Sequence, residues 1–160
     1  MKNINPENTD APTKSSTEAT SGSLSNQQLE LPSSMEGMHI IEKLIETICS
    51  TYKLSEDHYG NIIVAVTEAV NNAIYHGNKA DPNKKVHVGF KTSPKSISFS
   101  IRDEGPGFDF NNLPDPTDPA NIEKPSGRGI FLMKHLADEV SFSEDGRCVF
   151  LSFKMEEASN

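Results

Sequence analysis

The sequence lacks long apolar runs and blocks of basic residues. Hydrophobic residues make up only 34% of the 160 positions, and no run is long enough to cross a membrane. The formal net charge is −8 and no basic block accompanies it, whereas nucleic-acid-binding proteins carry a concentrated positive surface. We therefore expect neither a membrane association nor a direct nucleic-acid partner. An acidic chain can still bind a polyphosphate when Mg²⁺ or backbone N–H groups supply the positive field.

Cysteine is scarce, and no Cys/His cluster has the spacing of a metal site. The two cysteines, Cys49 and Cys148, each lie inside an apolar pattern, which favours small buried side chains over a disulfide. The apolar core of a signal peptide is also missing. These features predict a reducing, cytoplasmic setting.

Large apolar side chains are almost absent from residues 1–26, which consist mainly of Ser, Thr, Asn, Pro, Glu and Lys. Such a segment cannot bury enough surface to offset the entropy of ordering. The sequence therefore predicts a disordered tail at 1–26, one domain with a modest core at 27–155, and a short C-terminal tail at 156–160.

The rest of the chain contains segments of helical and of strand periodicity in the order β-α-α-β-β-loop-α-β-β. The expected elements are a strand at 28–31, a helix opened by a capping box from Ser33 to Glu36, a helix from its N-cap Ser55 to a stop at Gly77, strands at 85–90 and 96–102, a helix at 127–137, and a hairpin of strands at 140–143 and 148–153. Because helices and strands do not strictly alternate, this order predicts an α+β fold with a mixed sheet covered by helices on one face.

A first polar motif, E68-A-V-N-N-A-I-Y-H-G77, lies at the end of the second helix. Glu68 and Asn72 are four residues apart and project from one face, beside an apolar stripe where polar groups are costly to bury without partners. One interpretation is a solvated pair. The other is a site in which Asn72 offers its carbonyl oxygen to a hard cation and Glu68 accepts a proton from a water or hydroxyl. Mg²⁺ often takes only one or two protein ligands and the rest from phosphates and water.

A second motif, R102-D-E-G-P-G-F108, follows an alternating strand. Gly and Pro there are compatible with a simple tight turn. The alternative is a site in which Asp103 recognises a ligand while Gly105 and Gly107 let the backbone approach it.

A third motif, S126-G-R-G129, comes at the expected start of a helix, after a loop that holds five prolines between positions 103 and 126. Bare backbone N–H groups at a helix N-terminus form an anion site, although a flexible hinge would use the same residues. A loop of this length in a compact domain is usually functional or mobile.

Together, in this order, the three motifs resemble the GHKL ATPase superfamily, which includes histidine kinases, DNA gyrase B and MutL. The similarity spans roughly residues 28–154, and the motifs most resemble those of the bacterial anti-sigma-factor serine kinases. The resemblance implies a Bergerat-type fold, a two-layer α/β sandwich with a mixed, mostly antiparallel sheet and helices on one face. It also implies that 27–155 is an ATP-binding kinase domain.

The resemblance also implies roles for individual residues. Asp103 is expected to accept a hydrogen bond from the adenine amine, while Asn72 binds Mg²⁺ and Glu68 acts as general base. Residues 109–125 would form a lid over ATP. The nucleotide-binding residues implied by the resemblance are Asn72, His76, Asp103, Gly105, Gly107, Ser126, Gly127, Arg128 and Gly129.

One departure from the family concerns the last hairpin, where members usually carry Thr in a G-T-x pattern near the adenine. Here the stretch is G146-R-C-V149, so a hydroxyl contact beside Asp103 is missing and nucleotide affinity is expected to be lower. The chain also shows no histidine phosphoacceptor helix, which argues against a complete histidine kinase.

The activity implied by the resemblance is ATP-dependent phosphorylation of Ser or Thr on a small anti-anti-sigma, STAS-like protein, by a homodimer that also sequesters a sigma factor. The residues leave two alternatives open. One is a binding module that holds nucleotide and a partner without phosphoryl transfer, and the other is a dimerisation domain with a vestigial pocket.

Overall fold

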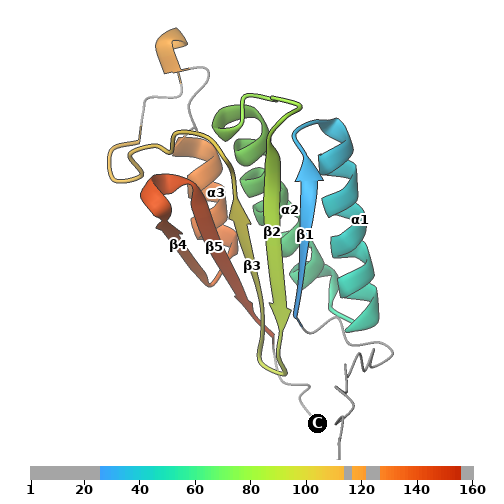
Figure 1. Ribbon diagram of the computed structural model, residues 1–160. Helices are drawn as coiled ribbons and strands as arrows, with labels where there is room; N and C mark the ends of the chain where they lie inside the picture. The colour runs from blue at the N-terminus through green and yellow to red at the C-terminus, as the bar shows by residue number, and fades with distance from the viewer. Residues whose placement is uncertain (1–25, 114–116, 122–126, 156–160) are drawn as a thin grey trace, which may run out of the picture.

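The fold combines one five-stranded sheet with helices in an α+β arrangement (Figure 1). The computed structural model describes residues 26–113, 117–121 and 127–155. The strands are β1 (Asn26–Pro32), β2 (Lys85–Thr92), β3 (Ser96–Arg102), β4 (Glu139–Ser143) and β5 (Cys148–Lys154). The helical elements are α1 (Met35–Thr51), α2 (Glu56–Asn71), the π-helix η1 (Asn72–Gly77), α3 (Gly127–Leu136), and the 3₁₀ turns η2 (Pro119–Asn121) and η3 (Glu144–Gly146). The predicted tails lie almost wholly outside the described residues.

The strand order is β1-β2-β3-β5-β4, and every neighbouring pair is antiparallel. The α+β, mostly antiparallel fold predicted from the sequence is confirmed, and the described strands contain no parallel pair. Since β3 is central in the sheet, residues at its end lie between the start of β2 and the β4–β5 turn.

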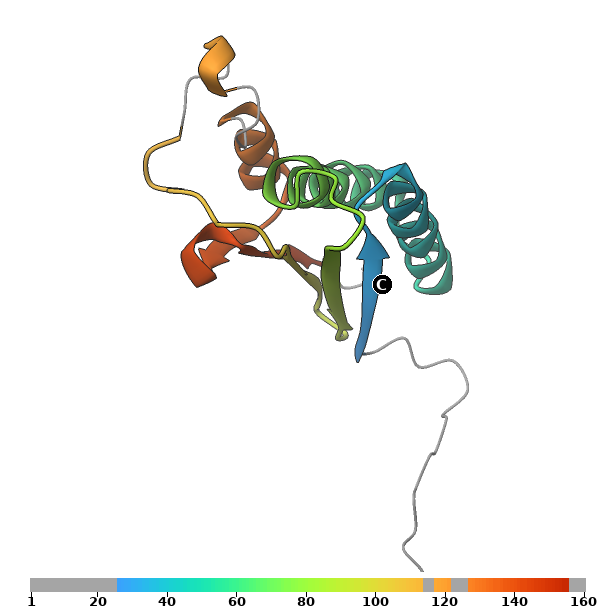
Figure 2. The same ribbon diagram turned by 45° about the horizontal axis from the view of Figure 1, so that its top comes forward.

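The three α-helices cover one face of the sheet and leave the other face open, as Figures 1 and 2 show. Successive strand residues point to opposite faces, so alternate residues of each strand supply the core. The buried strand residues are Leu31, Val86, Val88, Phe90, Ile97, Phe99, Ile101, Val149, Leu151 and Phe153. They pack against the apolar stripes of the helices, such as Ile41, Ile45 and Ile48 of α1. No helix in the described part of the chain is long and apolar enough to span a membrane.

The predicted capping box at Ser33 is wrong. The N-cap of α1 is Ser34, which makes no side-chain cap hydrogen bond. Ser33 is instead buried at the β1–α1 corner, where its Oγ donates to the Lys84 carbonyl at 2.6 Å. The hydrogen bond from Ser33 to the distant residue Lys84 therefore takes the place of the predicted helix cap. The Ser55 cap is confirmed, because its Oγ accepts from the backbone N–H of His58 at 3.2 Å.

The second helix ends at Gly77 as predicted, but its last turn is a π-helix. Such wider turns occur mostly as short segments and are frequent at functional sites. The π-helical segment begins at Asn72, so Asn72 and His76 of the first motif lie on a turn with non-standard spacing, whereas Glu68 lies on the regular helix α2.

Both cysteines are free thiols. Cys49 is buried as predicted, whereas Cys148 is only half-buried, because it belongs to the set of β5 residues that alternate with the core positions. Burial raises the pKa of both thiols.

Candidate functional site

A small cavity lies where α2, η1 and α3 meet the end of β3 and the β4–β5 turn, with a volume of about 40 Å³. Four of the predicted site residues line it: Asn72, His76, Asp103 and Gly107. The other lining residues are Ala69, Ala73, Gly77, Ile101, Phe108, Met133, Phe142, Gly146, Arg147 and Val149. Residues of the first and second motifs, which are far apart in the sequence, thus meet at one place, whereas no described residue of the third motif lines the cavity.

Asp103 is held at this cavity by backbone hydrogen bonds. Its N–H donates to the Arg147 carbonyl at 2.9 Å, and its Oδ1 accepts from the Gly105 N–H at 2.8 Å. Burial raises the pKa of Asp103, although the Gly105 hydrogen bond and the positive charges of Arg147 and Lys84 oppose that rise. A partly buried carboxylate is therefore fixed in place with capacity for a further donor, as recognition of an amine requires.

The loop after β3 packs backbone to backbone on the π-helical turn. A Cβ at Gly105 would collide with the Gly77 carbonyl, and a Cβ at Gly77 would lie 2.5 Å from Asp103 Oδ2. Gly105 is buried and does not line the cavity. In the ligand-free protein, Gly105 therefore serves the contact between the two segments.

Gly107 and Gly146 interlock the same loop with the β4–β5 turn. Both have positive φ, 83° and 89°, a conformation that favours glycine. The Phe108 N–H donates to the Asp145 carbonyl at 2.9 Å. A Cβ at Gly107 would collide with that carbonyl, and one at Gly146 would lie 2.5 Å from the Phe108 carbonyl. Sequence reasoning missed Gly146 as a site residue, although its place in a turn was evident.

His76 supplies an unsatisfied polar atom. Its Nδ1 is buried and has no hydrogen-bond partner in the described part of the chain, although the residue as a whole is only half-buried. A buried polar atom without a partner costs stability. His76 also lines the cavity.

The remaining walls are mostly apolar and partly aromatic, although Arg147 also lines the cavity. Phe108 packs edge-on against Phe142 with ring centroids 5.6 Å apart, and Phe110 stacks on Phe142 at 5.3 Å. Ile101 and Met133 complete the apolar lining. An apolar cavity with one fixed carboxylate suits a planar heteroaromatic ring that carries an amino group. The present volume holds only a few waters.

Several predicted residues lie outside this cavity. Glu68 is half-buried on α2, one turn before Asn72. Gly127, Arg128 and Gly129 open α3 as predicted, with Arg128 exposed and Gly129 buried. Ser126 and part of the predicted lid, 114–116 and 122–125, lie outside the described residues.

The site fits a cation only together with phosphates. Among the described residues, no group of three or more His, Cys, Asp or Glu side chains could hold a metal ion. Asn72 offers one amide oxygen at the cavity. One such oxygen would suffice only for an ion, such as Mg²⁺, that takes its other ligands from a polyphosphate and water.

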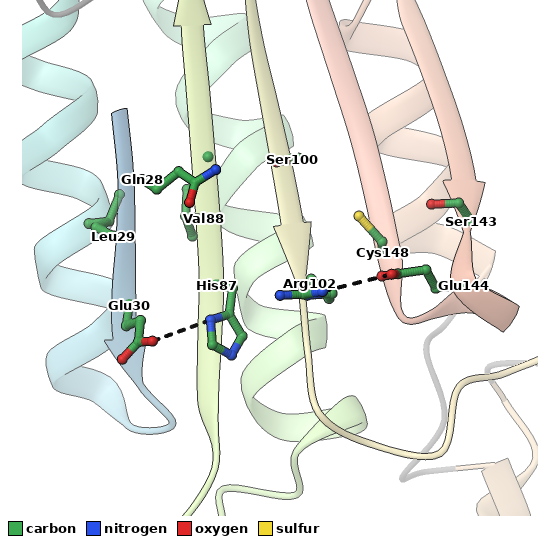
Figure 3. A pocket seen from close by; sticks show the side chains of 11 residues that line it. Gln28, Leu29, Glu30, His87, Val88, Ser100, Arg102, Ser143, Glu144 and Cys148 are labelled. Atoms are coloured by element: carbon green, nitrogen blue, oxygen red, sulfur yellow. Dashed lines mark ion pairs between the residues drawn. The ribbon is translucent and has the colours of Figure 1, made fainter. Parts of the chain in front are cut away.

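A more spacious hollow of about 580 Å³ lies on the open face of the sheet (Figure 3). Two ion pairs join neighbouring elements there, His87–Glu30 at 3.6 Å and Arg102–Glu144 at 3.7 Å. None of the predicted site residues lines it, and such exposed pairs contribute little stability. The candidate site is the smaller cavity, where residues of the first two polar motifs meet.

Comparisons with known proteins identify the family. The profile of the family described as "Histidine kinase-like ATPase domain" matches residues 31–153. Serine-protein kinase RsbW of Bacillus subtilis (strain 168) is 28% identical over 119 residues, covering 71% of this chain and 74% of that protein. Serine-protein kinase RsbW of Oceanobacillus iheyensis is 25% identical over 122 residues, covering 72% and 77%.

A solved structure gives a likeness of fold. The crystal structure of the RsbU and RsbW domains of a Mycobacterium tuberculosis protein matches with a TM-score of 0.56 at 13% identity. The match covers 81% of this chain and 31% of the other, so this chain spans about a third of that protein.

Proposed function

The chain belongs to the histidine kinase-like ATPase domain family, and we propose that it is an ATP-dependent protein kinase that phosphorylates Ser or Thr on a small anti-anti-sigma, STAS-like protein. One observation carries the nucleotide assignment. At the cavity, the Asp103 carboxylate accepts a hydrogen bond from the Gly105 N–H, and the backbone N–H of Asp103 donates to the Arg147 carbonyl. An ionised carboxylate accepts from the exocyclic amine of adenine, whereas guanine presents a carbonyl oxygen at that position.

The polar residues next to the base position would contact the sugar and phosphates. His76 Nδ1, which has no partner in the described protein, would gain one from the nucleotide or its water. Ser126, Gly127, Arg128 and Gly129 would bind the phosphates at the N-terminus of α3, where backbone N–H groups and the helix dipole favour anions. When bound, Mg²⁺ would neutralise phosphate charge, with Asn72 as its protein ligand.

Phosphoryl transfer would then depend on Glu68. The hydroxyl oxygen of the target Ser or Thr attacks the γ-phosphorus, the bond from that phosphorus to the β,γ-bridging oxygen breaks, and ADP leaves with the electron pair. The hydroxyl proton passes to the Glu68 carboxylate. Positioning and charge stabilisation supply most of the rate in such reactions.

The similarity to serine-protein kinases of the RsbW type supports the choice of partners. We include in the proposal a cytoplasmic homodimer in which residues 27–155 form the kinase domain, and which sequesters a sigma factor until the STAS-like protein releases it.

A second candidate function is a nucleotide-dependent binding module without phosphoryl transfer. One observation favours it: Glu68 does not line the cavity that Asn72 and Asp103 share. Arg147, at a position where the family resemblance implies Thr, also lines the cavity.

Incubation with γ-labelled ATP, Mg²⁺ and a candidate STAS-like protein separates the two functions. The kinase proposal predicts label on a Ser or Thr of that protein. Tight ATP binding with no transferred label would support the binding module instead. Absence of ATP binding would reject both.

A further inference from the structure

Asn78 is a buried polar residue just after the π-helical turn, and the nucleotide-binding motifs do not include it. Its exposed fraction is 0%, so every polar atom of its side chain needs a partner inside the protein. The side-chain oxygen accepts from the Glu104 N–H at 2.7 Å. The amide nitrogen donates to the Lys85 carbonyl and to Ser33 Oγ, both at 3.0 Å.

These partners fix the orientation of the amide. The Glu104 N–H can only donate and the Lys85 carbonyl can only accept, so exchange of the amide oxygen and nitrogen would break both hydrogen bonds. The Glu104 carboxylate closes a ring, because its Oε2 accepts from the Lys85 N–H at 2.8 Å. Asn78, Lys85 and Glu104 therefore join the end of η1, the start of β2 and the loop after β3.

The ring bears directly on Asp103, the residue before Glu104. The Asp103 N–H is held from the opposite side by the Arg147 carbonyl. Consequently the peptide units on both sides of Asp103 are fixed, one by Arg147 in the β4–β5 turn and one by Asn78. Asn78 does not line the cavity, so any effect on a ligand passes through this backbone.

We propose that Asn78 is a positioning residue that sets the place of the Asp103 carboxylate and thereby the selection of adenine over guanine. The selection of adenine rests on the proposed function, whereas the hydrogen bonds by which Asn78 holds the loop after β3 do not. A purely structural Asn78 would affect stability and leave nucleotide selection unchanged.

The test compares Asn78→Ala with Ser33→Ala in the full chain. Ser33 is 4% exposed and belongs to the same network, but it does not touch Glu104. Both variants are expected to lower the thermal midpoint. Only Asn78→Ala should speed hydrogen exchange of the Glu104 amide in the ligand-free protein and reduce the ratio of ATP to GTP affinity, each by roughly tenfold, as expected for one lost buried hydrogen bond. An unchanged ratio or unchanged exchange in folded Asn78→Ala would overturn the proposal.

Glu104→Ala provides the second variant if Asn78→Ala does not fold. Its exposed side chain can be removed without a cavity, and it opens the same ring at Lys85. The ratio of affinities should again fall, by about threefold or more, and an unchanged ratio would overturn the proposal. A wild type that binds no ATP would reject the proposed function and the selection role, whereas exchange of the Glu104 amide would still decide whether Asn78 holds the loop.

Discussion

The carboxylate of Asp103 lies directly against the backbone of Gly77, so that a Cβ at position 77 would come within 2.5 Å of Asp103 Oδ2. The end of a helix and the end of a central strand thus meet without an intervening side chain. Asp103 also lines the same cavity as Asn72 and His76 of η1. The motif around Asp103 is therefore in contact with η1 and is not only a local turn.

Substitution of Gly107 should disrupt the site through the backbone. Gly107→Ala forces a side chain into positive φ and against the Asp145 carbonyl, so we expect a loss of about 1–3 kcal/mol of folding free energy together with weaker ATP binding. The matched control is Gly60→Ala in α2, where nothing lies within 4 Å of the added Cβ. It should gain about 0.5–1 kcal/mol. Denaturant unfolding measures both, and equal stability of the two variants would contradict the interlocked loops.

Asn72→Ala should abolish Mg²⁺-dependent ATP binding while the fold is retained, because Ala suits a helical position. Calorimetry with Mg-ATP measures the effect, and circular dichroism checks the fold. Unchanged Mg-ATP affinity would reject the role of Asn72 as metal ligand.

Glu68→Gln keeps the shape of the side chain and removes the proton acceptor. We expect phosphoryl transfer to fall by about 10²-fold or more, with ATP affinity nearly unchanged. Single-turnover transfer of labelled phosphate compares the variant with the wild type. Full transfer by the variant would make Glu68 structural.

Acidification should weaken ATP binding at a higher pH than for an ordinary Asp. Burial raises the pKa of Asp103, and a protonated carboxyl group is a poorer acceptor for the adenine amine. Affinity should therefore fall as the pH drops through this raised pKa. In the ligand-free protein, the effect of pH on folding stability has the opposite sign. Because the pKa of Asp103 is raised in the folded protein, its contribution to stability is present at low pH and is lost as the pH rises through that pKa. ATP titrations over a pH series test the predicted loss of affinity on acidification, and the Asp103→Asn variant should not show this loss.

The order of helices and strands could be predicted from the sequence because hydrophobic periodicity is a local signal. The stripe from Ile62 to Val70 and the alternation in β3 both correspond to buried faces. Local motifs were less reliable where a tertiary partner competed, as at Ser33, whose hydroxyl binds Lys84 rather than capping α1. The π-helical turn had no distinct sequence pattern.

The convergence of Asn72, His76 and Asp103 could be expected only through the resemblance to a known family, because periodicity does not tell which loops meet. Asn78 shows what remains hidden. Its partners, Ser33, Lys85 and Glu104, are 45, 7 and 26 residues away in the chain. In the sequence, a polar residue after a helix indicates only an ordinary turn. The role of Asn78 becomes visible when the fold brings these partners together.

The most direct test of an adenine site at Asp103 is a nucleotide titration of wild type against Asp103→Asn. The amide can present N–H groups toward the adenine amine, so ATP binding should weaken by about 1.5–3 kcal/mol, or roughly one to two decades of affinity. Discrimination against GTP should fall, because the same amide can donate to the guanine oxygen. The ligand-free variant should be at least as stable as the wild type, since the buried charge is gone. Equal ATP affinities in the two folded proteins would contradict the adenine pocket and leave the motif as a turn.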